Sequence, residues 1–156
     1  MDALEWLSTT LLAVQLRRSA ILYMLVNAAH ILAICLLIGT ILPLDLRLLG
    51  VFRSVPVEII GPFLSGAAAT GVALAILTGF CLFSVRPMEY AGNAAFLSKL
   101  GLLALGLLNV VLVHAGSGWR LAVSTGIIRP GLRISAALSL VIWIAALIAG
   151  RWIGFL

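Results

Sequence analysis

The sequence predicts an all-α fold: an integral membrane four-helix up-down-up-down bundle with an N-terminal interfacial amphipathic helix. The first observation behind this prediction is composition, because 63 % of the 156 residues are hydrophobic, 10 % are charged, and the mean hydropathy is +1.25. A soluble domain has about a quarter of its residues charged, so lipid is the main solvent of this chain. The other two observations are four long apolar stretches and the shortness of the segments that join them.

The N-terminal segment, residues 2–18, is predicted to form a helix that lies in the membrane interface. Apolar side chains recur at helical spacing beside polar ones, at Leu4, Leu7, Leu11 and Val14. Such a pattern gives the helix one face for lipid and one for water.

Four transmembrane helices follow, because a hydrocarbon core about 30 Å thick takes about 20 helical residues to cross. Helices are predicted because the period-two alternation of barrel strands is missing and an open sheet leaves backbone groups unpaired in lipid. Short connections make successive helices antiparallel and make residues 1–156 a single membrane domain. The predicted spans are residues 19–44, 59–85, 96–115 and 134–151.

A stripe of small residues runs along the second predicted span, at Ala67, Gly71, Ala75 and Gly79. Small residues let the backbone of a neighbouring helix approach closely. We expect this stripe to pack inside the bundle in preference to forming a dimer contact.

The net charge of +5 and the isoelectric point near 10.3 come from arginines scattered between the apolar stretches. They form no basic stripe, which argues against a nucleic-acid partner and makes them topology signals. Basic residues are nearly balanced between the two ends of the bundle, but Arg17 and Arg18 fall on the interfacial helix, and the orientation rule weighs loops. We therefore expect both termini to be periplasmic.

Motifs of soluble enzymes are missing from the sequence: it has no phosphate loop, nucleophile elbow, zinc-type Cys/His spacing or dinucleotide fingerprint. Cys35 and Cys81 each lie inside an apolar stretch, as small hydrophobic residues do. Candidate functional residues are therefore sought among polar side chains at membrane depth, which are costly to bury without a partner.

The first predicted span carries Tyr23, Asn27 and His30 on one helical face, at positions i, i+4 and i+7. His30 lies about nine residues, or about 13 Å, inside the N-terminal boundary of the span. Two interpretations of His30 stay open. One is a structural hydrogen bond to a neighbouring helix, and the other is ligation of a cofactor, with heme iron first among the candidates.

The second histidine, His114, is near the far end of the third predicted span. Because the first and third helices run in the same direction, His114 lies about 15 Å from the level of His30. Axial imidazoles of one heme lie at nearly the same depth. We therefore exclude the two histidines as ligands of a single iron and expect His114 to be an interfacial residue.

Other polar residues reach the level of His30 in the half of the bundle nearest the termini. Lys99, the only lysine, follows a predicted N-cap at Asn93 by about one turn, and Thr78 reaches similar depth on the second span. Lys99 is either part of a site that needs an amine or a lysine that extends to the interface. Arg151 ends the fourth span on the same side and offers a positive charge to a propionate or another anion.

Asp45 and Arg47 follow the first predicted span at the opposite end. We expect a local ion pair between them, or pairing of Asp45 with Arg129 or Arg133. Gly50 is expected to end the helix.

The order of these features resembles a family of small bacterial inner-membrane proteins that contain a domain of unknown function. The resemblance covers almost the whole chain, on His30-Ile31-Leu32, Gly39, Asp45 to Gly50, Thr78-Gly79, Asn93 to Phe96 with Lys99, Ser139-Leu140 with Trp143, and Gly150-Arg151.

More distantly, a first-helix histidine with a third-helix lysine is similar to the four-helix, heme-binding protoporphyrinogen oxidases. The general plan is similar to the membrane domain of copper-resistance D proteins. The former likeness implies a heme site at His30 and Lys99, but the oxidase activity is not carried over because the loops and flanking residues differ.

We expect a small inner-membrane protein that binds one heme b through His30 and takes part in membrane electron transfer. Lys99, Tyr23 or Asn27 supplies the opposite ligand or a supporting contact, and Thr78 and Arg151 belong to the same cofactor site. A second hypothesis is a non-catalytic membrane subunit that anchors or assembles a larger respiratory or transport complex. A small transporter or metal-handling protein is the third, disfavoured by the scarcity of intramembrane carboxylates.

Overall fold

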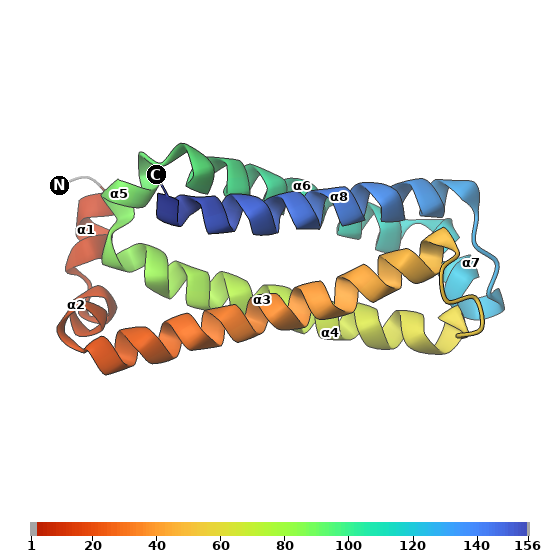
Figure 1. The fold of residues 1–156 in the computed structure, drawn as a ribbon, viewed down its shortest axis with the longest axis horizontal. Helices are drawn as coiled ribbons and strands as arrows, with labels where there is room; N and C mark the ends of the chain where they lie inside the picture. Colours follow the sequence, from red (N-terminus) through yellow and green to blue (C-terminus); the bar gives the residue numbers. More distant parts are fainter. Residues whose placement is uncertain (1–2, 156) are drawn as a thin grey trace.

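The computed structural model of the protein describes residues 3–155, which form eight α-helices and one short 3-10 helix, with no strand in that range (Figure 1). Four of the helices run along the long axis of the molecule, and the shorter ones gather at its two ends. The four are long and apolar enough to cross a membrane: α3 (Ala20–Leu49), α4 (Val57–Val85), α6 (Ala94–Ala115) and α8 (Pro130–Trp152). They indicate a membrane protein whose outer surface contacts lipid.

The first long helix, α3, extends beyond the predicted membrane span of residues 19–44. It continues to Leu49, and Gly50, with φ at +103°, ends it as predicted. A left-handed residue after the last turn favours glycine, which has no Cβ to clash. Asp45 and Arg47 therefore belong to the helix and not to a connecting segment.

Local signals set the starts of two other long helices. The Asn93 side chain accepts a hydrogen bond from the Phe96 amide at 3.0 Å, so α6 begins at Ala94 behind the predicted N-cap. Pro130 opens α8, because its fixed φ suits the first helical position and its missing N–H would have had no partner there.

The N-terminal segment forms two short helices and not the single helix predicted for residues 2–18, of which residue 2 lies outside the described range. α1 spans Ala3–Thr9 and α2 spans Leu11–Arg18. The break falls at Thr10, which is extended and whose hydroxyl accepts a hydrogen bond from the Ala13 amide at 3.4 Å. α2 packs on α3 and α4 and buries Ala13 and Leu16 against them.

The two ends of the bundle are closed by different short helices. At the end that holds α1 and the last turn of α8, here called the terminal end, α5 (Pro87–Ala91) joins α4 to α6. At the opposite end, the α7 end, α7 (Ser117–Thr125) lies in the segment between α6 and α8 and buries Trp119 and Ala122. The 3-10 helix η1 (Ile153–Phe155) follows α8.

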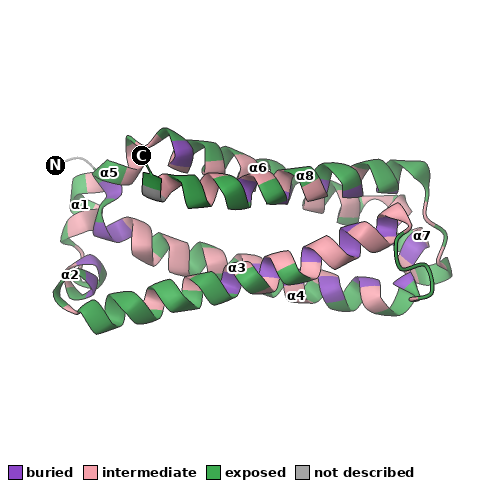
Figure 2. Ribbon diagram, in the orientation of Figure 1, coloured by how far each residue is buried: buried purple, intermediate pink, exposed green. Residues whose placement is uncertain are grey.

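The apolar core is concentrated toward the α7 end, where Figure 2 shows α3 changing from mostly exposed to a mixture of buried and intermediate residues. One cluster there comprises Leu44, Leu48, Val57, Leu64, Trp119, Ala122, Leu132 and Ala136. A second cluster, nearer the middle, comprises Leu37, Ile41, Ala68 and Trp143. In the terminal half, the long helices bury only small or short side chains: Ala33, Ser84, Val85, Ala95 and Ala146.

The small-residue stripe of α4 packs inside the bundle, as predicted. A methyl group at Gly71 would lie 2.7 Å from the backbone nitrogen of Leu37 on α3, closer than real side chains approach. The absence of a side chain at Gly71 therefore allows the close contact between α3 and α4.

Candidate functional site

The buried face of α3 continues into the terminal half through His30. Ala33, Leu37 and Ile41 are buried at four-residue steps, and His30 lies three residues before Ala33, half-buried. On α4, Oγ1 of Thr78 lies 2.8 Å from Nδ1 of His30. The structure thus brings together two of the residues predicted to share a site.

The hydrogen bonds of Thr78 determine the tautomer of His30. The Thr78 hydroxyl donates its only hydrogen to the Leu74 carbonyl, 2.6 Å away within α4, so its oxygen accepts from His30. Nδ1 is therefore the protonated nitrogen of the neutral ring, and Nε2 carries the lone pair. The His30 ring also donates to the Ala75 carbonyl, and no hydrogen bond to Nε2 is described within residues 3–155.

The imidazole ring of His30 also packs against Gly79, the next residue along α4. A methyl group at Gly79 would lie 3.1 Å from Cε1 of His30. A larger residue would have to displace the ring. Gly79 therefore restricts the orientation of the imidazole, and Thr78 favours one tautomer.

Lys99 approaches the same part of the bundle from α6 and lies across Gly150 of α8. Its Nζ would be 3.3 Å from a methyl group at Gly150. The half-buried Lys99 side chain makes no hydrogen bond or ion pair with any residue that the structure describes. Among the described charged groups, Lys99 alone acts electrostatically on His30, so the two side chains lie in the same region.

The other three predicted site residues have different surroundings. Tyr23 interacts with Tyr90 of α5. Asn27 is exposed and makes no hydrogen bond within the described range. The Arg151 guanidinium lies over the ring of Phe155, 4.7 Å from its centroid.

An aromatic cluster at the terminal end was not predicted from the sequence. The rings of Phe83 and Phe96 stack with 5.4 Å between centroids, and Tyr90 lies 5.4 Å from Phe96 and 6.2 Å from Phe83. Burial, followed by the contact with Tyr23, raises the pKa of Tyr90 above its usual value. The sequence feature that could have predicted this cluster is the presence of aromatic residues in and beside the connection between the second and third spans.

His114 differs from His30 in that both of its ring nitrogens are used. Nδ1 lies 2.8 Å from the Val110 carbonyl, which can only accept, so Nδ1 is protonated. Nε2 then accepts from the Ser65 hydroxyl at 2.6 Å. The ring also packs on Trp119 with 4.7 Å between centroids, and these contacts leave no free lone pair for a metal.

Asp45 corrects an expectation, because it forms no ion pair among the described residues. It is 4 % exposed, inside the core of the bundle, and hydrogen-bonds to Ser139 of α8. Arg47 does not pair with it, because its Nε donates to the Val55 carbonyl at 2.5 Å. The prediction failed because Asp45 was placed beyond the predicted membrane span of residues 19–44, where a carboxylate would have been solvated.

No group of three or more His, Cys, Asp or Glu side chains that could hold a metal ion is present in the described range. A metal at His30 would therefore need most of its ligands from elsewhere. A porphyrin supplies four nitrogen ligands and needs only axial groups from the protein, so the free lone pair of His30 fits heme better than a bare ion.

Comparisons with known proteins address the identity of the chain and not its chemistry. Neither the curated proteins nor the solved structures give a match. The expected distant likeness to heme-binding oxidases and copper-resistance proteins therefore stays a prediction. The model of a family of unknown function, DUF6644, matches residues 3–156, and the chain belongs to that family.

Proposed function

We propose that the protein binds one heme b in the terminal half of the bundle, with Nε2 of His30 as an axial ligand, and takes part in membrane electron transfer. The observation that carries the proposal is the hydrogen bond between Nδ1 of His30 and Thr78, from which we infer that Nε2 carries the lone pair. Histidines that bind metals usually donate their other N–H to an oxygen acceptor in this way. Bound heme supplies one-electron chemistry at its iron.

Lys99 is the preferred candidate for the opposite ligand or a supporting contact. It lacks a hydrogen-bonding partner within the described range, whereas Tyr23 is engaged with Tyr90. Its amine would ligate when neutral, or would pair with a propionate when charged. Arg151, next in sequence to Gly150, is proposed to bind a propionate from the end of α8.

The packing of the terminal half supports a large apolar occupant. Residues 20–32 of α3, 72–83 of α4 and 147–152 of α8 include no buried residue. Gly79 and Gly150 border His30 and Lys99, where larger residues would contact these side chains. A planar cofactor between these helices would bury apolar faces that the protein itself leaves uncovered.

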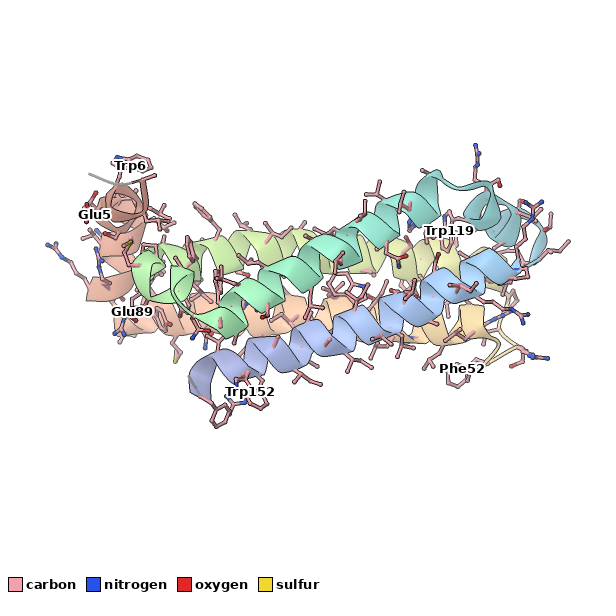
Figure 3. All side chains as sticks on the ribbon, turned by 90° about the horizontal axis from the view of Figure 1, so that it is seen from above. Glu5, Trp6, Phe52, Glu89, Trp119 and Trp152 are labelled. Atoms are coloured by element: carbon pink, nitrogen blue, oxygen red, sulfur yellow. The ribbon has the colours of Figure 1, made fainter. Side chains whose placement is uncertain are left out.

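We further propose that the four long helices form an up-down-up-down bundle in the bacterial inner membrane, with both termini periplasmic and α1 and α2 at the interface. Exposed aromatic side chains project outward at both ends, Trp6 and Trp152 at one and Phe52 at the other, whereas Trp119 points inward (Figure 3). Tryptophan rings favour the membrane–water interface. Arg17 donates to the carbonyls of Ser8 and Val85. These bonds support leaving Arg17 out of the loop charges that are counted to predict the orientation.

The proposal is tested by titrating the purified protein in mild detergent with hemin and following the absorbance of the bound form. We expect saturation at one heme per chain, and weaker binding or an altered spectrum for Lys99→Met. Absence of a saturable site would overturn the proposal and favour a non-catalytic membrane subunit, for which co-purification with a membrane partner is the matching measurement.

A further inference from the structure

A second polar cluster lies in the core toward the α7 end, away from His30. Asp45 of α3 is 4 % exposed and Ser139 of α8 is 3 % exposed. Ser139 hydrogen-bonds to the Asp45 carboxyl, while Oδ2 of Asp45 is buried without a partner in the described range. Trp143, one turn from Ser139 along α8, has a buried Nε1 that also lacks a described partner.

The immediate surroundings of Asp45 are apolar. Leu44 and Leu48, its neighbours along α3, belong to the core cluster that includes residues of α4, α7 and α8. Ile41, one turn earlier, packs in the cluster that contains Trp143. Apart from burial, Ser139 is the only described residue that acts on the Asp45 carboxyl.

Charged side chains on the helices around Asp45 either contact other groups or are exposed. Arg47 on α3 donates to a backbone carbonyl. Glu58 on α4 lies against Gly126, where a methyl group would be 2.6 Å from Oε1. Arg120 on α7 and Arg133 on α8 are exposed, and none of these residues forms an ion pair with Asp45.

We propose that Asp45 is an internal proton-binding site, whose carboxyl holds a proton and is a neutral acid in the core. An ionised carboxylate with one hydroxyl partner and no cation is strongly disfavoured in an apolar interior, whereas the neutral acid is not. A metal cation would need more oxygen ligands than Asp45 and Ser139 supply. Proton binding converts the carboxylate to a carboxylic acid and changes no other bond.

Asp45 lies nearer to the α7 end of the bundle than to the terminal end. Asp45 lies four residues before α3 ends at Leu49, which is about 6 Å along the helix axis. His30 is fifteen residues away in the other direction, about 22 Å along the same axis. If the carboxyl exchanges its proton with water, we therefore expect the α7 end to be the nearer side, away from the His30 site.

The test is infrared spectroscopy of the purified full chain in mild detergent at neutral pH, in H2O and in D2O. We expect a carbonyl band of a protonated carboxylic acid that shifts to lower frequency in D2O and is absent from Asp45→Asn. Ser139→Ala should keep the band at a shifted frequency, because the carboxyl loses its hydrogen-bond partner. Glu89→Gln, which changes an exposed acid paired with Arg86 at 3.3 Å, should leave the band unchanged.

The proposal is overturned if the wild-type chain lacks this band at neutral pH, if the band persists in Asp45→Asn, or if Ser139→Ala leaves its frequency unchanged. If Asp45→Asn fails to fold, the D2O shift of the wild-type band and its frequency in Ser139→Ala still test the proposal. Hemin binding in the same samples is a separate readout. A chain that has the acid band and binds no heme keeps the proton site and loses the proposed function.

Discussion

Thr78 accepts a hydrogen bond from His30 across the contact between α3 and α4, with 2.8 Å between Oγ1 and Nδ1. The bond has a direction because the Thr78 hydrogen is donated to the Leu74 carbonyl. His114 provides a comparison within the same chain, since its two nitrogens are bonded to Val110 and Ser65. One histidine keeps an available lone pair and the other does not.

Replacing Thr78 with valine should weaken heme binding while the chain still folds. Valine keeps the shape of threonine but removes the acceptor that orients the His30 ring. Loss of such a partner weakens metal binding by about 10- to 100-fold. Hemin titration measures the change.

Thr70→Val is the matched control for this prediction. Thr70 is an exposed threonine of the same helix whose hydroxyl donates to the Gly66 carbonyl at 3.0 Å. We expect its substitution to leave heme affinity unchanged. Equal losses of heme affinity in the two variants would contradict the prediction, because they would show a general effect of substitution in α4 and not the loss of the His30 hydrogen bond.

Gly71→Ala should destabilise the bundle, whereas Gly66→Ala should not. The new methyl group would meet the Leu37 backbone at Gly71, but would find nothing within 4 Å at Gly66. Overpacking of this kind costs about 1–3 kcal/mol, while alanine in an open helical position gains about 0.5–1 kcal/mol over glycine. Thermal unfolding in mild detergent, followed by circular dichroism, compares the variants. Similar midpoints would contradict the close contact.

Tyr90 should titrate above its usual value in the folded protein. In Tyr23→Phe it is the only tyrosine left, since the chain has two, and burial, the largest cause of its raised pKa, remains. A folded-state pKa above the unfolded value gives stability that is present at lower pH and is lost as pH rises through the folded value. Ultraviolet absorbance of tyrosinate gives the midpoint, and a midpoint at the usual 10.0 would contradict the burial of Tyr90.

The sequence was sufficient to predict the long helices because hydropathy over about 20 residues is a strong signal. It also predicted the ends at Gly50 and Asn93, where the residue type itself makes the cap. It missed the break at Thr10 and the helix α7, since short helices depend on local hydrogen bonds and on tertiary packing.

The site was predicted only in part, because helical periodicity gives the depth and face of a residue but not its partner on another helix. The helical rise per residue predicted that His30 and Thr78 lie at similar depth and that His114 lies at a different one, and the structure confirms both. It could not show that Tyr23 contacts Tyr90 or that Asp45 is buried against Ser139. Those contacts depend on the rotation of each helix and on where α3 ends.

The most direct test of the heme proposal is the reduced-minus-oxidised absorbance spectrum of the purified protein, with His30→Ala and His114→Ala compared with the wild type. We expect the wild type and His114→Ala to show the Soret and α bands of a b-type heme, and His30→Ala to lose them while remaining folded. A flat wild-type spectrum with adequate heme supply, or bands that persist in His30→Ala, would contradict the assignment of His30 as the axial ligand.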